Sequence, residues 1–237
     1  MVALQMLTSM ATRAVLEELA APGVLAGLPP VELESAGGVV VAERIRSGES
    51  ADLVVLAADA IHRLVDEGHV RPSVVALFTA EAVLAVPTGA PEPPLTSAQD
   101  LREALEAAAA IGYSTGPSGD GLLRLFEQWG LADTLRDRLV RAQPGVPVGA
   151  LVAQRQVTLG VQQRSELQGL DGVQVVGPLP GDAAIRTTFT GGVLTASKRP
   201  EDGASALQHL GHLAGTDLAG SGLVDLVRRH GMEPSTP

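Results

Sequence analysis

Three short turns combine hydroxyl side chains or glycines with the predicted start of a helix. They are Thr8-Ser9, Ser35-Ala36-Gly37-Gly38, and the segment from Ser114 to Gly121. Glycine lets the backbone approach a ligand closely, and the N–H groups of a first helical turn lie free at the positive end of the helix dipole. A hydroxyl adds one more donor. Each turn could therefore bind an anion, although a capped strand-to-helix turn without a ligand is the alternative interpretation.

The third turn is the most distinctive, because Gly116 and Gly119 flank Pro117 and Ser118. Proline suits a tight turn, and two glycines around a serine are costly to keep without a reason. The lysine of a phosphate-binding P-loop is absent, and the glycine spacing differs from that of a dinucleotide fingerprint. The turns predict ligand contacts at Thr8, Ser9, Ser35, Gly37, Gly38, Ser114, Pro117, Ser118 and Gly119.

The elements that must position these turns alternate between short apolar strands and amphipathic helices. Residues 53–56 form a continuous apolar run, which predicts a strand buried on both faces. The spacing of Thr12, Val15, Leu16 and Leu19 predicts one face of a helix that Ser9 caps. Alternation of this kind favours parallel sheets with helices on both faces, in which ligands bind at the carboxyl ends of strands.

The remaining elements follow from the same patterns. Strands are predicted at 2–7, 31–34, 74–78, 82–86, 108–113, 157–161, 173–176 and 189–196, and two helices at about 201–213 and 218–230. Residues 79–81 are predicted to separate two strands, Pro22 and Gly23 to end the first helix, and the tail after residue 233 to fray. Ser97 and Asp100 have the spacing of a capping box.

Composition excludes several classes of function. The chain has 237 residues, no cysteine and a formal charge of −10, so thiolate catalysis and thiolate metal sites are excluded and nucleic-acid binding is disfavoured. No segment has the roughly 20 apolar residues that span a bilayer, so membrane insertion is not expected. The amino terminus reads directly as a strand and not as a secretory leader. We therefore expect a cytoplasmic protein, with a periplasmic location as the alternative if a leader has been removed.

Several segments together resemble the molybdate-type solute-binding proteins of bacterial transporters, over almost the whole chain. The resemblance rests on residues 49–59 after a Ser–Gly turn and its helix, on 83–89, on Ser118-Gly119, on 159–167 and on 231–234. It implies a two-lobed α/β fold of the type II periplasmic-binding-protein class, each lobe a mainly parallel sheet flanked by helices. Lobe 1 would contain 1–80 and 188–237, and lobe 2 would contain 81–187. Two hinge strands near 79–84 and 185–190 would join them around a ligand cleft.

Two departures from that family bear on the ligand. The molybdate binders carry a tyrosine where this chain has Gln163, beside Gln162, so both glutamines become expected ligand contacts. The segments 116–119, 160–163 and 176–180 resemble a side branch that includes aconitate isomerase. Glutamine amides can donate to a carboxylate and also accept from a neighbouring hydroxyl. The resemblance therefore implies a carboxylate ligand in place of molybdate.

An isomerase of this kind needs a group that removes a proton beside a carboxylate and returns it one carbon along. Glu81, near the first hinge, is the preferred candidate, followed by Asp120 and Glu34, and a hydroxyl acting through water is a further option. Arg164 and Arg186 could pair with additional carboxylates of the ligand, or could form ordinary surface ion pairs.

Two functions from different classes follow. The first is a cofactor-independent isomerase that acts on a small di- or tricarboxylate. The alternative is a solute-binding protein that delivers an oxyanion or carboxylate to the permease of an ABC transporter. A cytoplasmic ligand sensor ranks last, because no DNA-binding segment accompanies the fold.

Overall fold

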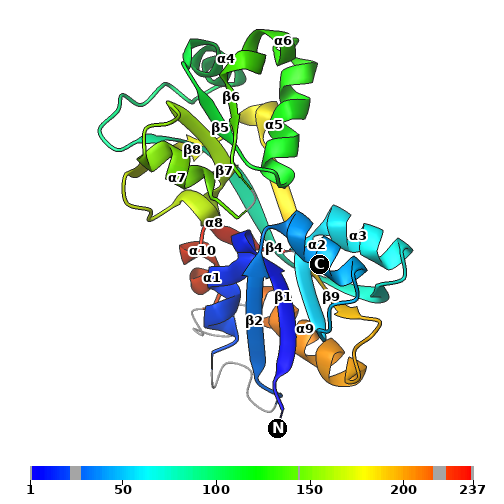
Figure 1. Cartoon of the computed structure of the whole chain (residues 1–237). Helices are drawn as coiled ribbons and strands as arrows, with labels where there is room; N and C mark the ends of the chain where they lie inside the picture. Colours follow the sequence, from blue (N-terminus) through cyan, green and yellow to red (C-terminus); the bar gives the residue numbers. More distant parts are fainter. Residues whose placement is uncertain (1, 22–27, 144, 216–222, 236–237) are drawn as a thin grey trace. The chain divides into compact units, whose positions relative to one another are not determined.

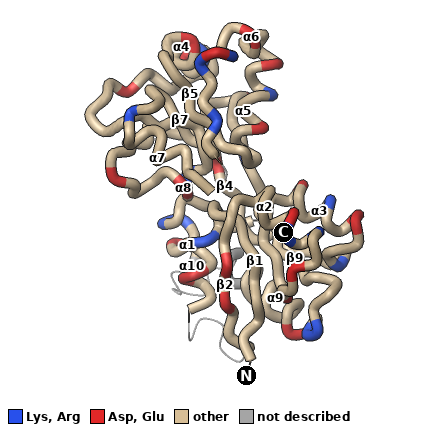
Figure 2. The backbone as a smooth tube through the Cα atoms, viewed as in Figure 1, with Lys and Arg blue, Asp and Glu red and all other residues tan. Residues whose placement is uncertain are grey.

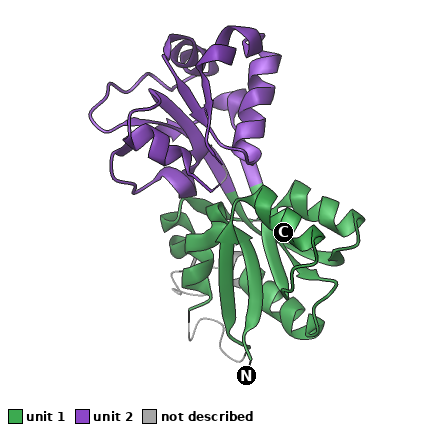
Figure 3. Cartoon of the chain, in the orientation of Figure 1, with its two compact units in different colours: residues 1–79, 188–237 green, residues 80–187 purple. Residues whose placement is uncertain are grey.

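A computed structural model describes residues 2–21, 28–143, 145–215 and 223–235. The chain divides into two compact units, which are coloured separately in Figure 3: residues 1–79 with 188–237, and residues 80–187. Both boundaries fall within strands, namely β4 (Val70–Pro87) and β9 (Arg186–Leu194). No helix in the described part of the chain is both long and apolar enough to cross a bilayer.

The first unit is built on strands in the order β2 (Val31–Ala36), β1 (Leu4–Ser9), β3 (Leu53–Ala57) and β9. The first three strands run parallel, and β9 is antiparallel to β3. Thr8 is in register with Ser35 on one side and with Val55 on the other, so the three strands end at one edge. The short strand β10 (Met232–Pro234) pairs with β4.

Five helices accompany this sheet in the described residues: α1 (Met10–Leu19), α2 (Gly38–Arg46), α3 (Ala58–Asp66), α9 (Pro200–Gly215) and α10 (Leu223–Arg229) (Figure 1). Apolar residues of α2 and α3 pack on Leu7, Val54 and Leu56 in one core cluster. The predicted stripe of α1 is confirmed, because all four of its residues are buried. Helices cover this sheet, and the core between the helices and the sheet is almost entirely aliphatic.

Asp52, within the segment that carries the family resemblance, ties three distant parts of the first unit together. Its carboxylate accepts hydrogen bonds from the backbone N–H of Gln5 at 3.1 Å, the hydroxyl of Ser197 at 2.7 Å and the guanidinium of Arg199 at 3.0 Å. Burial raises the pKa of Asp52, but these hydrogen bonds outweigh that effect, so the pKa lies below its ordinary value. Arg199 in turn donates to the carbonyl oxygens of Val2 and Ala3.

The second unit has a sheet in the order β4, β7 (Leu159–Gln163), β5 (Ile111–Tyr113) and β6 (Leu139–Arg141), with β8 (Val173–Pro178) also paired to β4. Strands β5, β6 and β7 are parallel, whereas β4 is antiparallel to β7 and β8. Gln163 lies opposite Ala82, and Val161 lies opposite Tyr113. The ends of β5 and β7 therefore lie side by side.

Helices cover both faces of this second sheet. The helices α4 (Ala98–Ala107), α5 (Pro117–Gln128) and α6 (Ala132–Leu135) share a core with Leu84, Val86 and Val161. On the other face, α7 (Val148–Ala153) packs on β7 and α8 (Arg164–Leu167) packs beneath Val83 and Ala85. Short 3-10 turns occupy 136–138 and 181–183. The capping box at Ser97 and Asp100 is confirmed, with both reciprocal hydrogen bonds present.

Several predicted boundaries are wrong for identifiable reasons. Residues 74–78 and 82–86 belong to one strand, β4, because no glycine or proline interrupts the segment from 74 to 86. The first strand extends through Ser9, so α1 begins at Met10 without an intervening turn. Ser9 occupies the N-cap position of α1, but its side chain makes no capping hydrogen bond.

The carboxyl-terminal prediction also needs correction. The tail does not fray immediately after residue 233, since Met232–Pro234 form β10 and the N–H of Ser235 donates to the carbonyl oxygen of Leu77. The prediction that Pro22 and Gly23 end the first helix concerns residues outside the described ranges. The segment 139–153 contains β6 and α7, neither of which the sequence patterns predicted.

Candidate functional site

The carboxyl edge of the first sheet brings together the first two predicted turns. Thr8 and Ser35 are register partners, and Ser9 is paired with Ala36, immediately before Gly37 caps α2. A Cβ placed on Gly38 would lie 4.0 Å from the Cβ of Ser9 and 3.7 Å from a methyl group of Leu56. The N-terminus of α2 is therefore adjacent to the end of β1, as the sequence pattern predicts.

The hydroxyl groups at this edge differ in how available they are. Thr8 is fully buried, and its Oγ1 lies 2.6 Å from that of Thr12 and 3.2 Å from the carbonyl oxygen of Val55. The Ser9 hydroxyl also contacts Thr12, at 3.1 Å. Ser35 is partly exposed. The Thr8 hydroxyl therefore has a structural role at this edge. Ser9, Ser35 and the backbone at Gly37 and Gly38 remain the predicted ligand contacts.

The second sheet has its own polar edge, formed where β5 and β7 end. Ser114 directly follows β5, and Gln162 and Gln163 are the last two residues of β7, just beyond the pair Tyr113 and Val161. The Ser114 hydroxyl accepts from the N–H of Gly116 at 3.2 Å and lies 3.1 Å from the hydroxyl of Ser118. This turn opens α5, with Pro117 in its first position. The second unit thus contains two of the sequence-predicted contact regions, the turn from Ser114 to Gly119 and the pair Gln162 and Gln163.

The two glycines of this turn have different structural roles. A Cβ on Gly119 would lie 1.9 Å from the carbonyl oxygen of Ser114, which is sterically impossible without moving the backbone. A Cβ on Gly116 would meet only the Ser114 hydroxyl, at 3.8 Å. Gly119 is therefore required for the helix to start against the preceding turn, whether or not a ligand is bound there.

Gln162 forms the centre of a hydrogen-bond chain that links three elements. Its Oε1 accepts from the backbone N–H of Val148 at 2.7 Å, and its Nε2 donates to a carboxylate oxygen of Glu166 at 2.8 Å. Gln162 is buried, while Glu166 is half-buried. Burial raises the pKa of Glu166 to about 7, although the hydrogen bond from Gln162 works in the opposite direction. Sequence analysis missed Glu166, because it was considered only as part of the family segment 159–167.

The side chain of Gln163 projects from the face of β7 opposite to that of Gln162, and one of its polar atoms has no hydrogen-bond partner. Its Nε2 donates to the hydroxyl of Thr187 at 2.7 Å, while its Oε1 is buried and has no hydrogen-bond partner. A side-chain amide can be rotated by half a turn, which would let Oε1 accept from Thr187 and leave Nε2 free to donate. In either orientation one polar group of Gln163 is left for another partner. Ser165 likewise has a buried hydroxyl without a partner.

The three predicted proton acceptors have unlike environments. Glu81 accepts a hydrogen bond from Arg186 at 2.8 Å, and Glu34 is paired with Arg44 at 2.6 Å. Asp120 is exposed on the first turn of α5. The carboxylates of Glu81 and Glu34 are each paired with an arginine, so a substrate would have to displace that arginine to reach them. These residues remain predicted bases, and Arg186 is already engaged as an ion-pair partner.

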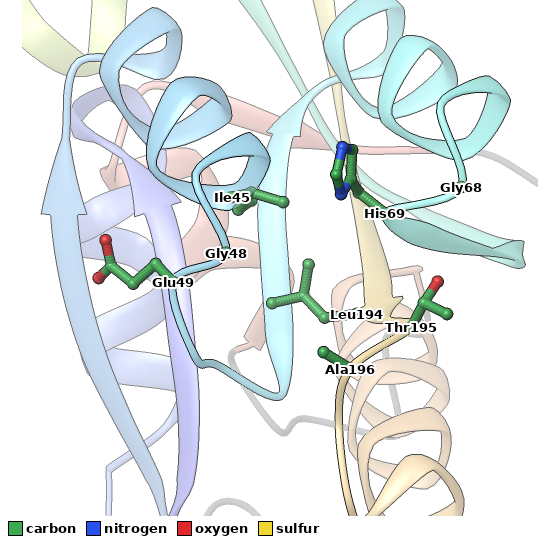
Figure 4. A pocket seen from close by; sticks show the side chains of 8 residues that line it. All are labelled: Ile45, Gly48, Glu49, Gly68, His69, Leu194, Thr195 and Ala196. Carbon is green, nitrogen blue, oxygen red and sulfur yellow. The ribbon is translucent and has the colours of Figure 1, made fainter.

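A separate pocket of about 290 Å³ lies in the first unit. Figure 4 shows its lining, which comes from Ile45, Gly48, Glu49, Gly68, His69, Leu194, Thr195 and Ala196. Gly48 and Glu49 precede β3, so this pocket lies at the opposite end of the strands from the predicted anion-binding turns. Arg44 donates to Glu49 and lowers the pKa of that carboxyl. None of the predicted ligand contacts lines this pocket.

Acidic and basic residues occur throughout both units. Figure 2 shows Lys and Arg interleaved with Asp and Glu along both units. An anion bound at these edges would be held mainly by neutral donors, namely backbone N–H groups, hydroxyls and amides. Such donors stabilise an anion locally even in a chain with a charge of −10.

Comparisons with known proteins agree with this architecture. The model of a family described as bacterial extracellular solute-binding proteins matches residues 4–213. The chain is similar to the periplasmic molybdate-binding protein of Azotobacter vinelandii, with a TM-score of 0.72, 18% identity and 99% of each chain covered. It is equally similar to the substrate-binding domain of a molybdenum ABC transporter from Clostridium difficile, with a TM-score of 0.71, 16% identity and both chains fully covered. These likenesses confirm the type II periplasmic-binding-protein fold.

A curated relative is more similar in sequence. An aconitate isomerase from a Pseudomonas species is 34% identical over 172 residues, which make up 72% of this chain and 65% of that protein. The chain thus spans less than two thirds of the length of this relative. The family's description as extracellular does not support the cytoplasmic location expected from the amino-terminal sequence. By its family match and its fold, this chain belongs to the bacterial extracellular solute-binding proteins.

Proposed function

We propose that this chain binds a small di- or tricarboxylate and isomerises it by moving a proton and a double bond. The observation that carries this proposal is the 34% identity to an aconitate isomerase, which far exceeds the identity to the molybdate-binding structures. Such an isomerisation consumes no oxidant and needs no cofactor, because the proton removed from one carbon is returned to another.

The chemistry of the two polar edges supports a carboxylate ligand. Serine hydroxyls, backbone N–H groups and glutamine amides all donate to carboxylate oxygens. With its amide rotated so that Oε1 accepts from Thr187, Gln163 has a free Nε2 that can donate to a carboxylate oxygen of the ligand. Each edge by itself offers such donors. The base for this reaction would be Glu81, Asp120 or Glu34 among the carboxylates that sequence analysis singled out.

The direct test is proton NMR of the purified protein with trans-aconitate in deuterated buffer. Migration of the double bond, with deuterium uptake at the carbon that gains a proton, would establish the isomerase. Absence of turnover and exchange over hours at high protein concentration would refute it. Calorimetric titration with trans-aconitate, run in parallel, reports binding independently of chemistry.

Arg164 offers a cation for an additional carboxylate of the ligand. It takes part in none of the ion pairs that the structure shows between described residues, whereas Arg186 is paired with Glu81. We expect Arg164→Gln to weaken trans-aconitate binding about tenfold, the effect of losing one charge-assisted hydrogen bond. Binding of a monocarboxylate should change less than about twofold on the same scale. Calorimetric titration of both ligands checks this, and equal losses for both would contradict it.

The second candidate function is a solute-binding protein of an ABC transporter for molybdate or another oxyanion or carboxylate. The family match and the fold of the molybdate-binding structures favour this alternative. It would place the chain outside the cytoplasm and give it a permease as partner. A thermal shift with molybdate that exceeds the shift with trans-aconitate, without turnover of the latter, would favour it.

A further inference from the structure

The side chains of Gln163 and Thr187 form a buried pair within the second unit. Nε2 of Gln163 donates to the Thr187 hydroxyl at 2.7 Å, and the exposed fractions of the two residues are 2% and 6%. Neither side chain makes another hydrogen bond with the described residues, and Oε1 of Gln163 is left without a partner. Because a buried polar atom without a partner is costly, the pair points to a further polar group that binds beside it.

The face of β7 that carries the Gln163 side chain is the one that packs on α5. Successive side chains of a strand alternate between its two faces. Gln162 accepts from the N–H of Val148 on the α7 side. Gln163 therefore projects with Val161 from the other face, where Val161 shares a core cluster with Leu122 of α5. The unpartnered amide atom thus lies on the α5 side of the sheet.

Thr187 lies on this same side and faces the amino-terminal part of α5. Ile185, two positions before it, packs so tightly there that a Cβ placed on Gly121 would lie 2.7 Å from its Cγ2. Arg186, between the two, is exposed and pairs with Glu81. In an extended segment this alternation makes Thr187 project in the same direction as Ile185. The amide–hydroxyl pair and the beginning of α5 are therefore neighbours.

The beginning of α5 supplies donors of the kind that bind an anion. Pro117 has no N–H, and Asp120 donates its N–H to the carbonyl oxygen of Gly116 at 3.1 Å. The N–H groups of Ser118 and Gly119 lie between them, in the part of a helix where N–H groups lack intrahelical acceptors. An anionic group here would also lie at the positive end of the helix dipole. The helix start and the unpartnered amide therefore suit the same ligand group.

The Thr187 hydroxyl determines which atom of the Gln163 amide is left for that group. A hydroxyl can donate as well as accept, and half a turn exchanges the two ends of a side-chain amide. If the hydroxyl accepts from Nε2, the oxygen Oε1 is left, and it would repel an anion. If the hydroxyl donates to Oε1, the free Nε2 can donate to an anion. A carboxylate at the beginning of α5 therefore requires the second arrangement.

We infer that Thr187 is a positioning residue for the carboxylate ligand. Its hydroxyl donates to Oε1 of Gln163, so that Nε2 donates to a carboxylate group that also accepts from the first N–H groups of α5. Thr187 thereby selects an ionised carboxylate over a hydroxyl or a protonated carboxyl, which would need Oε1 as its acceptor. This inference rests on the proposed function, because it specifies how the second unit binds the ligand of that function.

The test is calorimetric titration of trans-aconitate into wild type, Thr187→Val, Gln163→Met and the double variant. Valine keeps the shape of threonine without its hydroxyl, and methionine keeps the length of glutamine without its amide. We expect each single variant to bind about tenfold more weakly, the effect of losing about one hydrogen bond to a charged group. Because Thr187 acts through Gln163, the double variant should bind within about twofold of Gln163→Met. Thr187→Ser keeps the hydroxyl and should bind within about threefold of wild type.

Proton NMR of the Gln163 side-chain amide reports the hydrogen bonds directly. Its signals are assigned by their absence from the spectrum of Gln163→Met. Saturating trans-aconitate should shift one of the two amide protons of wild type downfield, because Nε2 then donates to a carboxylate. Thr187→Val should lose this shift even at saturation. A purely structural role of Thr187 would weaken binding but would leave the shift of the bound form unchanged.

The matched control is Thr158→Val, which removes an exposed hydroxyl beside the opposite end of β7. That hydroxyl donates to the carbonyl oxygen of Ala110 at 3.0 Å, so the control also loses one hydrogen bond, but its Kd should stay that of wild type. If wild type binds trans-aconitate and Thr187→Val binds it equally well, the role of Thr187 is overturned while the proposed function stands. A double variant about 100-fold weaker than wild type would overturn it too, because independent effects add. A wild type that does not bind trans-aconitate overturns the proposed function and this role together.

Discussion

Gly119→Ala is expected to weaken carboxylate binding about 100-fold, because moving the turn removes about two hydrogen bonds to a charged ligand, each worth about 1.5 kcal/mol. The added Cβ would lie 1.9 Å from the carbonyl oxygen of Ser114, so the turn and the start of α5 must separate. Separation breaks the contact between the hydroxyls of Ser114 and Ser118 and displaces the first N–H groups of the helix. Overpacking of this kind should also lower the free energy of unfolding by about 3 kcal/mol. Calorimetric titration and thermal unfolding measure the two effects.

Gly116→Ala is the control for the effect on stability. Gly116 has a φ of −100°, which alanine adopts without strain, and the nearest atom to its new Cβ would be 3.8 Å away. Its free energy of unfolding should stay within about 0.5 kcal/mol of the wild type. Equal destabilisation by the two substitutions would show that the close contact at Gly119 is not what constrains this turn.

Asp52→Asn should lower the free energy of unfolding by about 2 kcal/mol, because it leaves a partly buried arginine without its charged partner. The exposed side-chain fractions of Arg199 and Asp52 are 27% and 13%, so solvent screens this pair only in part. The amide could still accept from Ser197, but not with the strength of a carboxylate. Urea unfolding at pH 7 measures the loss.

The pH dependence of that loss follows from the direction of the Asp52 pKa. A pKa below its ordinary value of 3.8 means that the folded state favours the carboxylate, so the stabilisation is complete above about pH 4. It decreases as the pH falls through the lowered pKa of the folded state. The difference between wild type and Asp52→Asn should therefore shrink on acidification below pH 4.

The control for Asp52→Asn is Glu17→Gln, which removes an ion pair with Arg13 on the surface of α1. Both partners are at least half exposed, so the loss should be under about 0.5 kcal/mol. A loss as large as that of Asp52→Asn would mean that the network around Asp52 contributes no more than a surface pair.

The sequence by itself determined the fold class and the places where polar turns meet helices. Apolar runs such as 53–56 and the stripe on α1 are local patterns whose period is set by the backbone, so they can be recognised without tertiary information. Likewise, the glycines and serines of 35–38 and 114–119 mark helix starts because of their own conformational preferences. The segment resemblance extended these local patterns to a two-unit chain.

Only the tertiary structure decided which of these residues have free polar atoms. Thr8 is buried, and its hydroxyl can donate to the carbonyl oxygen of Val55, 47 positions away, a contact that arises only when β1 and β3 pair. Nothing in the local sequence distinguishes Glu81 from Glu166. In the structure, Glu81 is paired with Arg186, 105 positions away, whereas Glu166 accepts a hydrogen bond from the neutral amide of Gln162. Desolvation and pairing are set by neighbours that strand register brings together, so the distinction between these two carboxylates arises only in the folded chain.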